Sequence, residues 1–426
     1  MDSCSAMPRF GNATGPPLPS HYLDNLTALT VARPLPVNAL FNVRLDTAEN
    51  GGCAAWGEDV LNIFIQTAWD LSIAGLSAAG ILRQPQTSPP RIVAQAARLL
   101  GTYFQGVGID TPDELAIIEG ETISFVASLA FVQSGLPVRL ASEPPATKRP
   151  ILSTLGYYQQ VKNFLEHGVS DEFPINDGQS TRKPWLFCGD PFVRQHMHDV
   201  LLDNQGNVVM DERGNLLLIN DDRTMRTEYK RLQRTYRVTM YPHWSHDMKQ
   251  YIWSRSYGAS PLSGYCYANP AGGITWLGLG HTVAMQLCYD VDRVQNQPLG
   301  AIPPRPVLAD TLGGRNIPDG AQFIADIVPA GYRFTHELFH LVWGNANSVP
   351  RQGEVYDVLE MLGFRPINVR KADGTVVQER ISRDTTLINP PTYTAVALSW
   401  WYTMNKRTEY GHDVEFYSGM CTYGED

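Results

Sequence analysis

Residues 335–342 read Thr335-His-Glu-Leu-Phe-His340-Leu-Val. On a helix, positions four residues apart project from the same face, so His336 and His340 can hold one zinc ion between them. Glu337 follows the first histidine, where its carboxylate can lean over the open coordination position and take a proton from a bound water. The flanking residues are mostly apolar, which predicts a helix buried in the core. The stretch therefore predicts a zinc site on a core helix.

Length and composition predict a globular protein. The chain has 426 residues, of which 43% are hydrophobic and 18% are charged, enough apolar material for a large packed core. No long Gly/Ser-rich or Pro-rich linker divides it. We expect an extended N-terminal arm over residues 1–50 and a single domain over 51–426. Within that domain we expect an N-terminal helical lobe at about 51–200 and a zinc-site lobe at about 201–426.

Periodicity and turn residues predict the elements of this domain. Apolar residues recur at helical spacing over 60–81 and 91–104, which predicts two packed helices. Gly-containing turns between short apolar runs, at 203–219 and at 372–374, predict small β-hairpins. Asn389 followed by proline is typical of a helix start. The expected fold class is therefore α+β, predominantly helical with small hairpins.

Charge and hydropathy limit the partners. The formal net charge is −9, from 34 Lys+Arg against 43 Asp+Glu, which argues against a nucleic-acid partner. The nearest approach to a basic run, residues 223–237, also contains an acidic residue, and we interpret it as a solvated surface. No stretch reaches the roughly 18 apolar residues that a membrane span requires. We expect neither nucleic acid nor membrane as a partner, and the oligomeric state stays open.

Cysteines and sequons bear on the cellular compartment. The six cysteines never form Cys-x-x-Cys, so they are disulfides or buried thiols, and fifteen pairings are possible. Sequons at Asn12 and Asn25 favour secretion. The first residues do not resemble a signal peptide, which leaves a cytoplasmic location open.

A family resemblance follows from these motifs. The segment Thr335-His-Glu-Leu-Phe-His340-Leu-Val resembles the zinc helix of fungal deuterolysin-like metallopeptidases, the aspzincins and their relatives. Further similar stretches are Ala96-Ala-Arg-Leu-Leu-Gly101, Trp185-Leu-Phe-Cys-Gly-Asp190, Met285-Gln-Leu-Cys288 and Asn389-Pro-Pro-Thr-Tyr393. The resemblance implies a zincin-like metallopeptidase fold, a Zn²⁺ cofactor and a peptide or protein substrate. The chain departs from the family at Pro391, where the family has an aspartate.

Three acids are candidates for the third zinc ligand. Glu354, Asp357 and Glu360 follow one another at i+3 spacing, and we expect them on one face of a helix. The family's ligand motif, Gly-Thr-x-Asp-x-x-Tyr-Gly, survives loosely at residues 353–358, and the resemblance implies Asp357 as the ligand. Glu360 lies twenty residues after His340, a separation that suits Glu-type zinc peptidases. Asp357 is the favoured prediction, and the other two acids stay open as ligands or as partners of the ligand histidines.

The predicted activity is that of a zinc metalloendopeptidase, with Glu337 as general base and a tyrosine that steadies the oxyanion. Tyr356 and Tyr393 are candidates for the second role, and Tyr393 is the one we predict. Two alternatives remain: a zinc enzyme of peptide or natural-product biosynthesis on a peptidase-derived scaffold, and a non-catalytic metal-binding protein. The pairs His196/His198 and His243/His246 lack a partner at ligand spacing with a nearby base, so we expect no metal there.

Overall fold

The computed structural model describes residues 33–83, 88–105, 148–176, 178, 180–255, 257, 266–275, 278–287, 317, 323–329, 331–350, 352–371, 373–408 and 411–423. The sequons at Asn12 and Asn25 and most of the predicted N-terminal arm lie outside these residues. Within the described ranges, no helix has the length and apolar character needed to span a bilayer.

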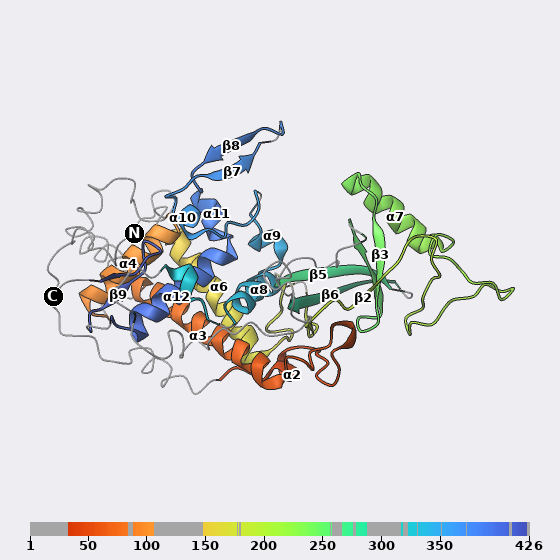
Figure 1. Ribbon diagram of the computed structural model, residues 1–426, viewed down its shortest axis with the longest axis horizontal. Coiled ribbons are helices and arrows are strands. Elements are labelled where there is room, and N and C mark those ends of the chain that lie inside the picture. Colours follow the sequence, from red (N-terminus) through yellow and green to blue (C-terminus); the bar gives the residue numbers. More distant parts are fainter. Residues whose placement is uncertain are drawn as a thin grey trace, which may run out of the picture.

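A group of long helices forms one end of the molecule (Figure 1). Its members are α3 (Glu58–Arg83), α4 (Pro90–Tyr103), α6 (Lys148–His167), α8 (Tyr332–Trp343) and α12 (Pro390–Asn405). Helix α3 contacts the other four, and α8 lies between α3, α6 and α12. The helices predicted at 60–81 and 91–104 are confirmed as α3 and α4, and the helix predicted after Asn389 is α12. The shorter helices are α2 (Val37–Leu40), η1 (Glu49–Gly51), α7 (Arg223–Tyr236), η4 (Ile324–Ile327), α9 (Asn345–Ser348), α10 (Val358–Met361) and α11 (Arg383–Leu387).

A six-stranded sheet extends from this helical end (Figure 1). Its strands are β1 (Trp185–Phe187), β2 (Phe192–Arg194), β3 (Tyr241–Ser245), β4 (Gln250–Ser254), β5 (Cys266–Thr275) and β6 (Gly278–Leu287). Their order is β1-β6-β5-β4-β3-β2, with β1 and β6 parallel and all other neighbours antiparallel. Strand β5 contacts α8, α9 and α7, so it connects the core helix to the far end of the sheet.

Small hairpins complete the described elements. Strands β7 (Ile367–Arg370) and β8 (Val376–Glu379) pair antiparallel around the turn at 372–374, which confirms that predicted hairpin. In the segment 203–219, two turns with Gly206 and Gly214 at positive φ are flanked by isolated bridges rather than by full strands. Near the C-terminus, β9 (Val414–Glu415) pairs with β10 (Thr422–Tyr423).

One large hydrophobic core draws on both predicted lobes. Its buried members run from Val37 to Cys421 and include apolar residues of α8. Tyr158 on α6 donates a hydrogen bond of 2.6 Å to the backbone carbonyl of Tyr393 on α12, which ties helices from both halves of the chain. Leu40 and Phe41, from the end of the predicted surface arm, are completely buried. This part of the arm is thus core rather than surface.

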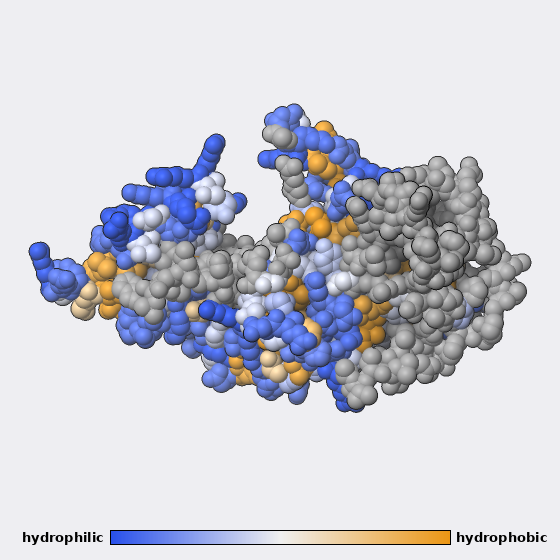
Figure 2. Space-filling view, turned by 180° about the vertical axis from the view of Figure 1, so that it is seen from behind, coloured by the Kyte–Doolittle hydropathy of each residue, from blue (hydrophilic) through white to orange (hydrophobic). Residues whose placement is uncertain are grey.

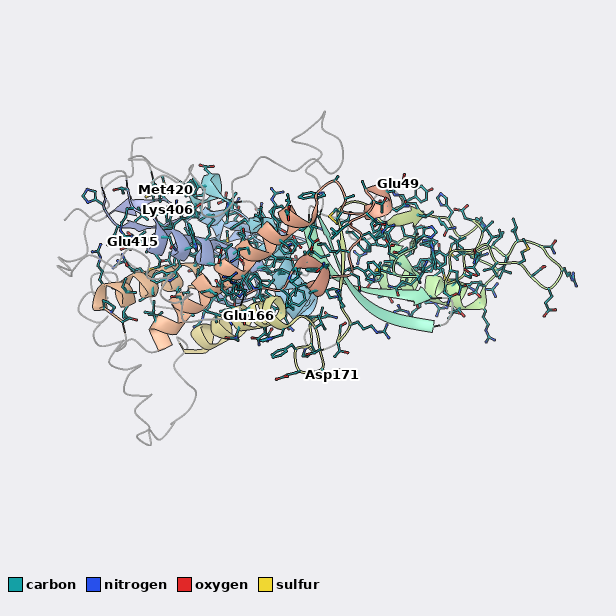
Figure 3. All side chains as sticks on the ribbon, turned by 90° about the horizontal axis from the view of Figure 1, so that it is seen from below. Glu49, Glu166, Asp171, Lys406, Glu415 and Met420 are labelled. Carbon is teal, nitrogen blue, oxygen red and sulfur yellow. A yellow bond between two sulfur atoms is a disulfide. The ribbon has the colours of Figure 1, made fainter. Side chains whose placement is uncertain are left out.

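Arginines attach the C-terminal strands to α4. Arg98 donates to both carboxylate oxygens of Glu415, and Gln95 donates to the same group. Arg91 pairs with Asp413. Figure 3 shows Glu415 at the same end of the molecule as Lys406 and Met420. The segment 413–415 is therefore attached to the helical end of the molecule.

A disulfide joins Cys53, just ahead of α3, to Cys188, just after β1. The two residues are 135 positions apart in the sequence, and their Cα atoms are 5.0 Å apart. The bridge therefore connects the helical end to the edge of the sheet.

Replacing Cys53 and Cys188 together by Ala should lower the free energy of unfolding by about 2–5 kcal/mol, because a crosslink across a long loop restricts the unfolded chain. Urea unfolding of the variant, beside the oxidised and the reduced wild type, measures this loss. An unchanged unfolding midpoint in the variant contradicts the pairing.

Candidate metal centre

Glycines set both ends of α8. Gly331 precedes the helix at φ +82°, and a Cβ there would lie 3.0 Å from the Cα of Phe64, so the helix start packs directly on α3. Gly344 ends the helix at φ +73°, and a Cβ there would lie 2.4 Å from Asn176 Oδ1. Every residue from Phe334 to Trp343 is buried, as the apolar flanks predict. The histidines therefore sit on a fixed helix inside the core.

His336, His340 and Glu354 meet in this core. The two Nε2 atoms are 3.2 Å apart. The Glu354 carboxylate lies 3.5 Å from His336 Nε2 and 2.5 Å from His340 Nε2. Within the described part of the chain, these three residues form the only group of three His, Cys, Asp or Glu side chains whose ligand atoms all lie within 4.8 Å of one another. Two helical histidines and one loop carboxylate thus make a metal-ligand set.

Ser348 determines which nitrogen of His340 faces this group. The Ser348 hydroxyl donates its single proton to the Gly344 carbonyl at 2.8 Å. Its oxygen must therefore accept the 2.8 Å hydrogen bond from His340 Nδ1. A neutral His340 protonated on Nδ1 presents the Nε2 lone pair to the cluster, the arrangement found in metal-ligating histidines.

The charges within the cluster favour a cation. Burial lowers the pKa of His336, so its neutral form is stabilised. Burial by itself raises the pKa of Glu354, but hydrogen bonds from both histidines and their charges outweigh it and hold the pKa far below the usual range. These contacts need protons on the histidines; in the neutral form, two imidazole lone pairs and one carboxylate converge on the same buried point. A shared proton satisfies one pair of these atoms, whereas a divalent ion satisfies all three.

The separations also suit zinc. Tetrahedral ligands at the usual Zn–N length of ~2.05 Å lie roughly 3.3 Å apart. The distances of 3.2 Å between the histidine nitrogens and 3.5 Å from His336 to Glu354 are close to this value. The shorter contact between His340 and Glu354 is that of a charge-assisted hydrogen bond. The donor set fits zinc.

Glu337 lies beside the ligands, where the sequence places it. It is 6% exposed, and its Oε1 atom is 3.6 Å from His336 Nε2. It is not part of the three-residue ligand group. A buried carboxylate next to a ligand set, and outside it, is in position to move a proton.

The structure places the other two acids elsewhere. The prediction of one helix carrying all three acids is wrong, because α10 begins only at Val358 and Asp357 caps it. The Asp357 carboxylate accepts the backbone N–H groups of Leu359 and Glu360 and pairs with Arg365 at 3.0 Å. Asp357 is therefore a half-exposed helix cap and does not belong to the ligand group. The sequence had favoured this residue as the third ligand. Glu360 lies in the first turn of α10, also outside the ligand group.

Of the two candidate tyrosines, Tyr356 is at the site. Its hydroxyl donates to the Glu354 carboxylate, and its ring lies 5.7 Å from the ring of His336. Desolvation and the anionic Glu354 raise the pKa of Tyr356, so the phenol stays protonated. Tyr393, the predicted catalytic tyrosine, is completely buried and donates instead to the Leu387 carbonyl at 2.8 Å. Packing among core aromatics explains its place, which does not fit a role at the substrate.

Asn389 holds the loop that carries Glu354. Its side-chain oxygen accepts the backbone N–H of Val355 at 3.0 Å, and its amide nitrogen donates to the Val355 carbonyl at 3.0 Å and to Thr392 Oγ1 at 2.9 Å. The residue is completely buried. From sequence it resembles a helix cap, yet its side chain makes no capping hydrogen bond to α12. The Asn389 side chain instead binds the backbone of Val355, the residue after Glu354. No sequence pattern near Asn389 predicts this contact.

The rival histidines do not build a second site. His196 and His198 are exposed, and His243 is buried with its Nδ1 atom 3.1 Å from the Tyr241 carbonyl. No ligand group within the described residues includes them.

No family model, curated protein or solved structure matches this chain. The deuterolysin-like resemblance and the zincin-like fold class therefore stay predictions.

Glu354→Ala should weaken zinc binding by about 100-fold or more, because it removes one of three ligands from a buried site. Asp357→Ala is the matched control and should stay within about threefold, since that carboxylate caps α10. Competition with a chromophoric chelator measures both affinities. The reverse order, with Asp357→Ala the weaker binder, contradicts the ligand set.

Asn389→Leu should weaken zinc binding by about 10- to 100-fold, since the loop bearing Glu354 loses its anchor. Thr394→Val removes a comparable buried hydrogen bond, from Thr394 to the Pro390 carbonyl on the same helix, without touching that loop. Both variants should be less stable in urea, and only Asn389→Leu should lose affinity. Equal affinities in the two variants would show that Asn389 has a purely structural role.

Proposed function

We propose that the chain is a zinc-dependent hydrolase that cleaves peptide bonds, with His336, His340 and Glu354 as ligands and Glu337 as general base. One observation carries the proposal: a buried carboxylate stands 3.6 Å from a ligand nitrogen and outside the ligand group. Metal storage does not need such a group, whereas hydrolysis by an activated water does.

Each side chain has a defined task. When bound, zinc supplies Lewis-acid polarisation of the scissile carbonyl and lowers the pKa of water. Glu337 accepts the proton of the attacking water and returns it to the leaving amine. Ser348 keeps the Nε2 lone pair of His340 directed at the metal position. The Tyr356 phenol stays protonated and now donates to Glu354; by turning this single proton away from Glu354 it would donate a hydrogen bond to the developing oxyanion.

Access to these groups supports a polymeric substrate. The ligands are buried, but Tyr356 beside them is 67% exposed, so the site opens to solvent on that side. Figure 2 shows the surface hollowed between the part that carries α7 and the β7–β8 hairpin. Such a hollow is wide enough to receive an extended polypeptide.

The compartment follows from the disulfide. A bridge between Cys53 and Cys188 persists in oxidising surroundings and is rare in the reducing cytosol. Together with the sequons, it favours a secreted enzyme over a cytoplasmic one.

Glu337→Gln should lower kcat on casein or a peptide library by about 100-fold or more while one zinc per chain stays bound, because the change removes the base and keeps the ligands. Glu360→Gln is the control, since it neutralises a carboxylate near the site but outside the ligand group. Elemental analysis and steady-state kinetics give the two readouts. The proposal fails if the protein takes up no zinc at neutral pH, or if Glu337→Gln keeps activity within tenfold.

A further inference from the structure

Helix α7 carries a line of cationic side chains. Arg223, Arg226, Lys230 and Arg234 follow one another at spacings of three, four and four residues, and all are exposed. At 3.6 residues per turn they span an arc of about 80°. The buried residues of the helix, Met225 and Leu232, lie on the opposite face, and Met225 packs into a small core with Trp244 and Tyr251 of the sheet. We call these four residues the α7 stripe.

The stripe is not neutralised within the described residues. The one acid on α7 is Glu228, and it pairs with Arg231, which lies outside the stripe. Asp222 uses its carboxylate to cap the helix at Met225. Like charges three and four residues apart on a helix repel one another, so the stripe weakens α7 in isolation. An anionic partner would remove that repulsion.

The stripe also has a fixed relation to the metal centre. Strand β5 contacts α7 and also contacts α8, which carries the metal-site histidines. Its ten residues span about 33 Å. The two helices are therefore held by the same strand, and Figure 1 shows them toward different ends of it. The stripe thus lies beyond the residues next to a scissile bond, on the α7 side of the surface hollow (Figure 2).

We propose that the α7 stripe is an exosite that binds an acidic segment of the polypeptide substrate. The inference rests on the proposed peptidase function and deepens it by naming the substrate class. From Arg223 to Arg234 the stripe is about 16 Å long, which matches roughly five residues of extended chain. A substrate with several Asp or Glu about ten residues from the cleavage point can contact both the stripe and the metal centre.

Neighbouring charges favour a short acidic peptide over a long polyanion. The segment 203–219, whose Val209 and Leu217 pack against the small core that contains Met225 of α7, bears Asp203, Asp211 and Glu212. A nucleic acid or an anionic bilayer extending past the stripe would meet these acids, and the net charge of −9 opposes both. A segment of about five residues avoids them.

The test uses fluorescence anisotropy at low salt to measure how tightly fluorescein-labelled ten-residue peptides bind to the full chain carrying Glu337→Gln. The acidic probe carries five Glu, and the control probe carries Gln at the same positions. The stripe variant combines Arg226→Glu with Lys230→Glu. Its control combines Arg33→Glu with Arg182→Glu, two exposed residues outside both α7 and the β7–β8 hairpin, so that both variants have the same net charge. A milder pair, Arg226→Gln with Lys230→Gln, and circular dichroism check that α7 stays folded.

We expect the acidic peptide to bind at least tenfold more tightly than the Gln peptide, and this preference to disappear in the stripe variant and persist in its control. Equal binding of the two peptides, or an acidic preference that survives in both stripe variants, overturns the exosite. So does stripe-dependent binding of single-stranded DNA or phosphatidylserine vesicles without peptide binding. If the protein binds the acidic peptide through the stripe but wild-type protein hydrolyses no peptide, the stripe is a binding site and the peptidase proposal is wrong. In active enzyme, the stripe variant should raise KM for an acidic substrate and leave kcat unchanged.

Discussion

Three electron-pair donors converge inside a hydrophobic core, and much of the local structure exists to keep them there. His336 Nε2, His340 Nε2 and the Glu354 carboxylate lie within hydrogen-bonding or near-bonding distance of one another. Buried lone pairs repel unless a proton or a cation lies between them. The cost of holding them together is met by the packing of α8, which is buried along its length and contacts helices on several sides.

Rigidity around this cluster comes from backbone contacts more than from the ligands themselves. Gly331 lets the start of α8 touch α3, and Ser348 holds His340 in one tautomer. Asn389 clamps the peptide of Val355 with two hydrogen bonds and so places both Glu354 and Tyr356. Gly331 and Ser348 flank α8 in the sequence, whereas Asn389, at the start of α12, is distant from the histidines along the chain. A centre held in this way is pre-organised, and little reordering is needed when a metal binds.

The distribution of charge separates two tasks. The metal centre is enclosed and carries acids, whereas α7 presents an exposed cationic face at the other end of β5. A protein of net charge −9 that concentrates cations on one helix face keeps a local attraction for anions despite its overall repulsion. Net charge alone therefore predicts the partner poorly, because a short ligand senses only the side chains within about 8–10 Å.

The shared face of His336 and His340 on α8 follows from the sequence alone, since a spacing of four residues puts both side chains on one side of a helix whatever surrounds them. The sequence likewise determined α3, α4 and α12 through helical periodicity and a proline start, and the β7–β8 hairpin through its glycine turn. Which carboxylate and which tyrosine lie beside the two histidines depends instead on contacts between distant segments. The acids at 354, 357 and 360 have helical spacing, but Asp357 caps α10, so the helix begins only at Val358. Glu354 therefore lies in the preceding loop, where its carboxylate contacts the histidines of α8. Tyr393 matches the motif, but its ring packs in the core against Trp343, and its backbone carbonyl accepts a hydrogen bond from Tyr158. These partners come from distant parts of the chain, so the sequence around Tyr393 does not reveal its role.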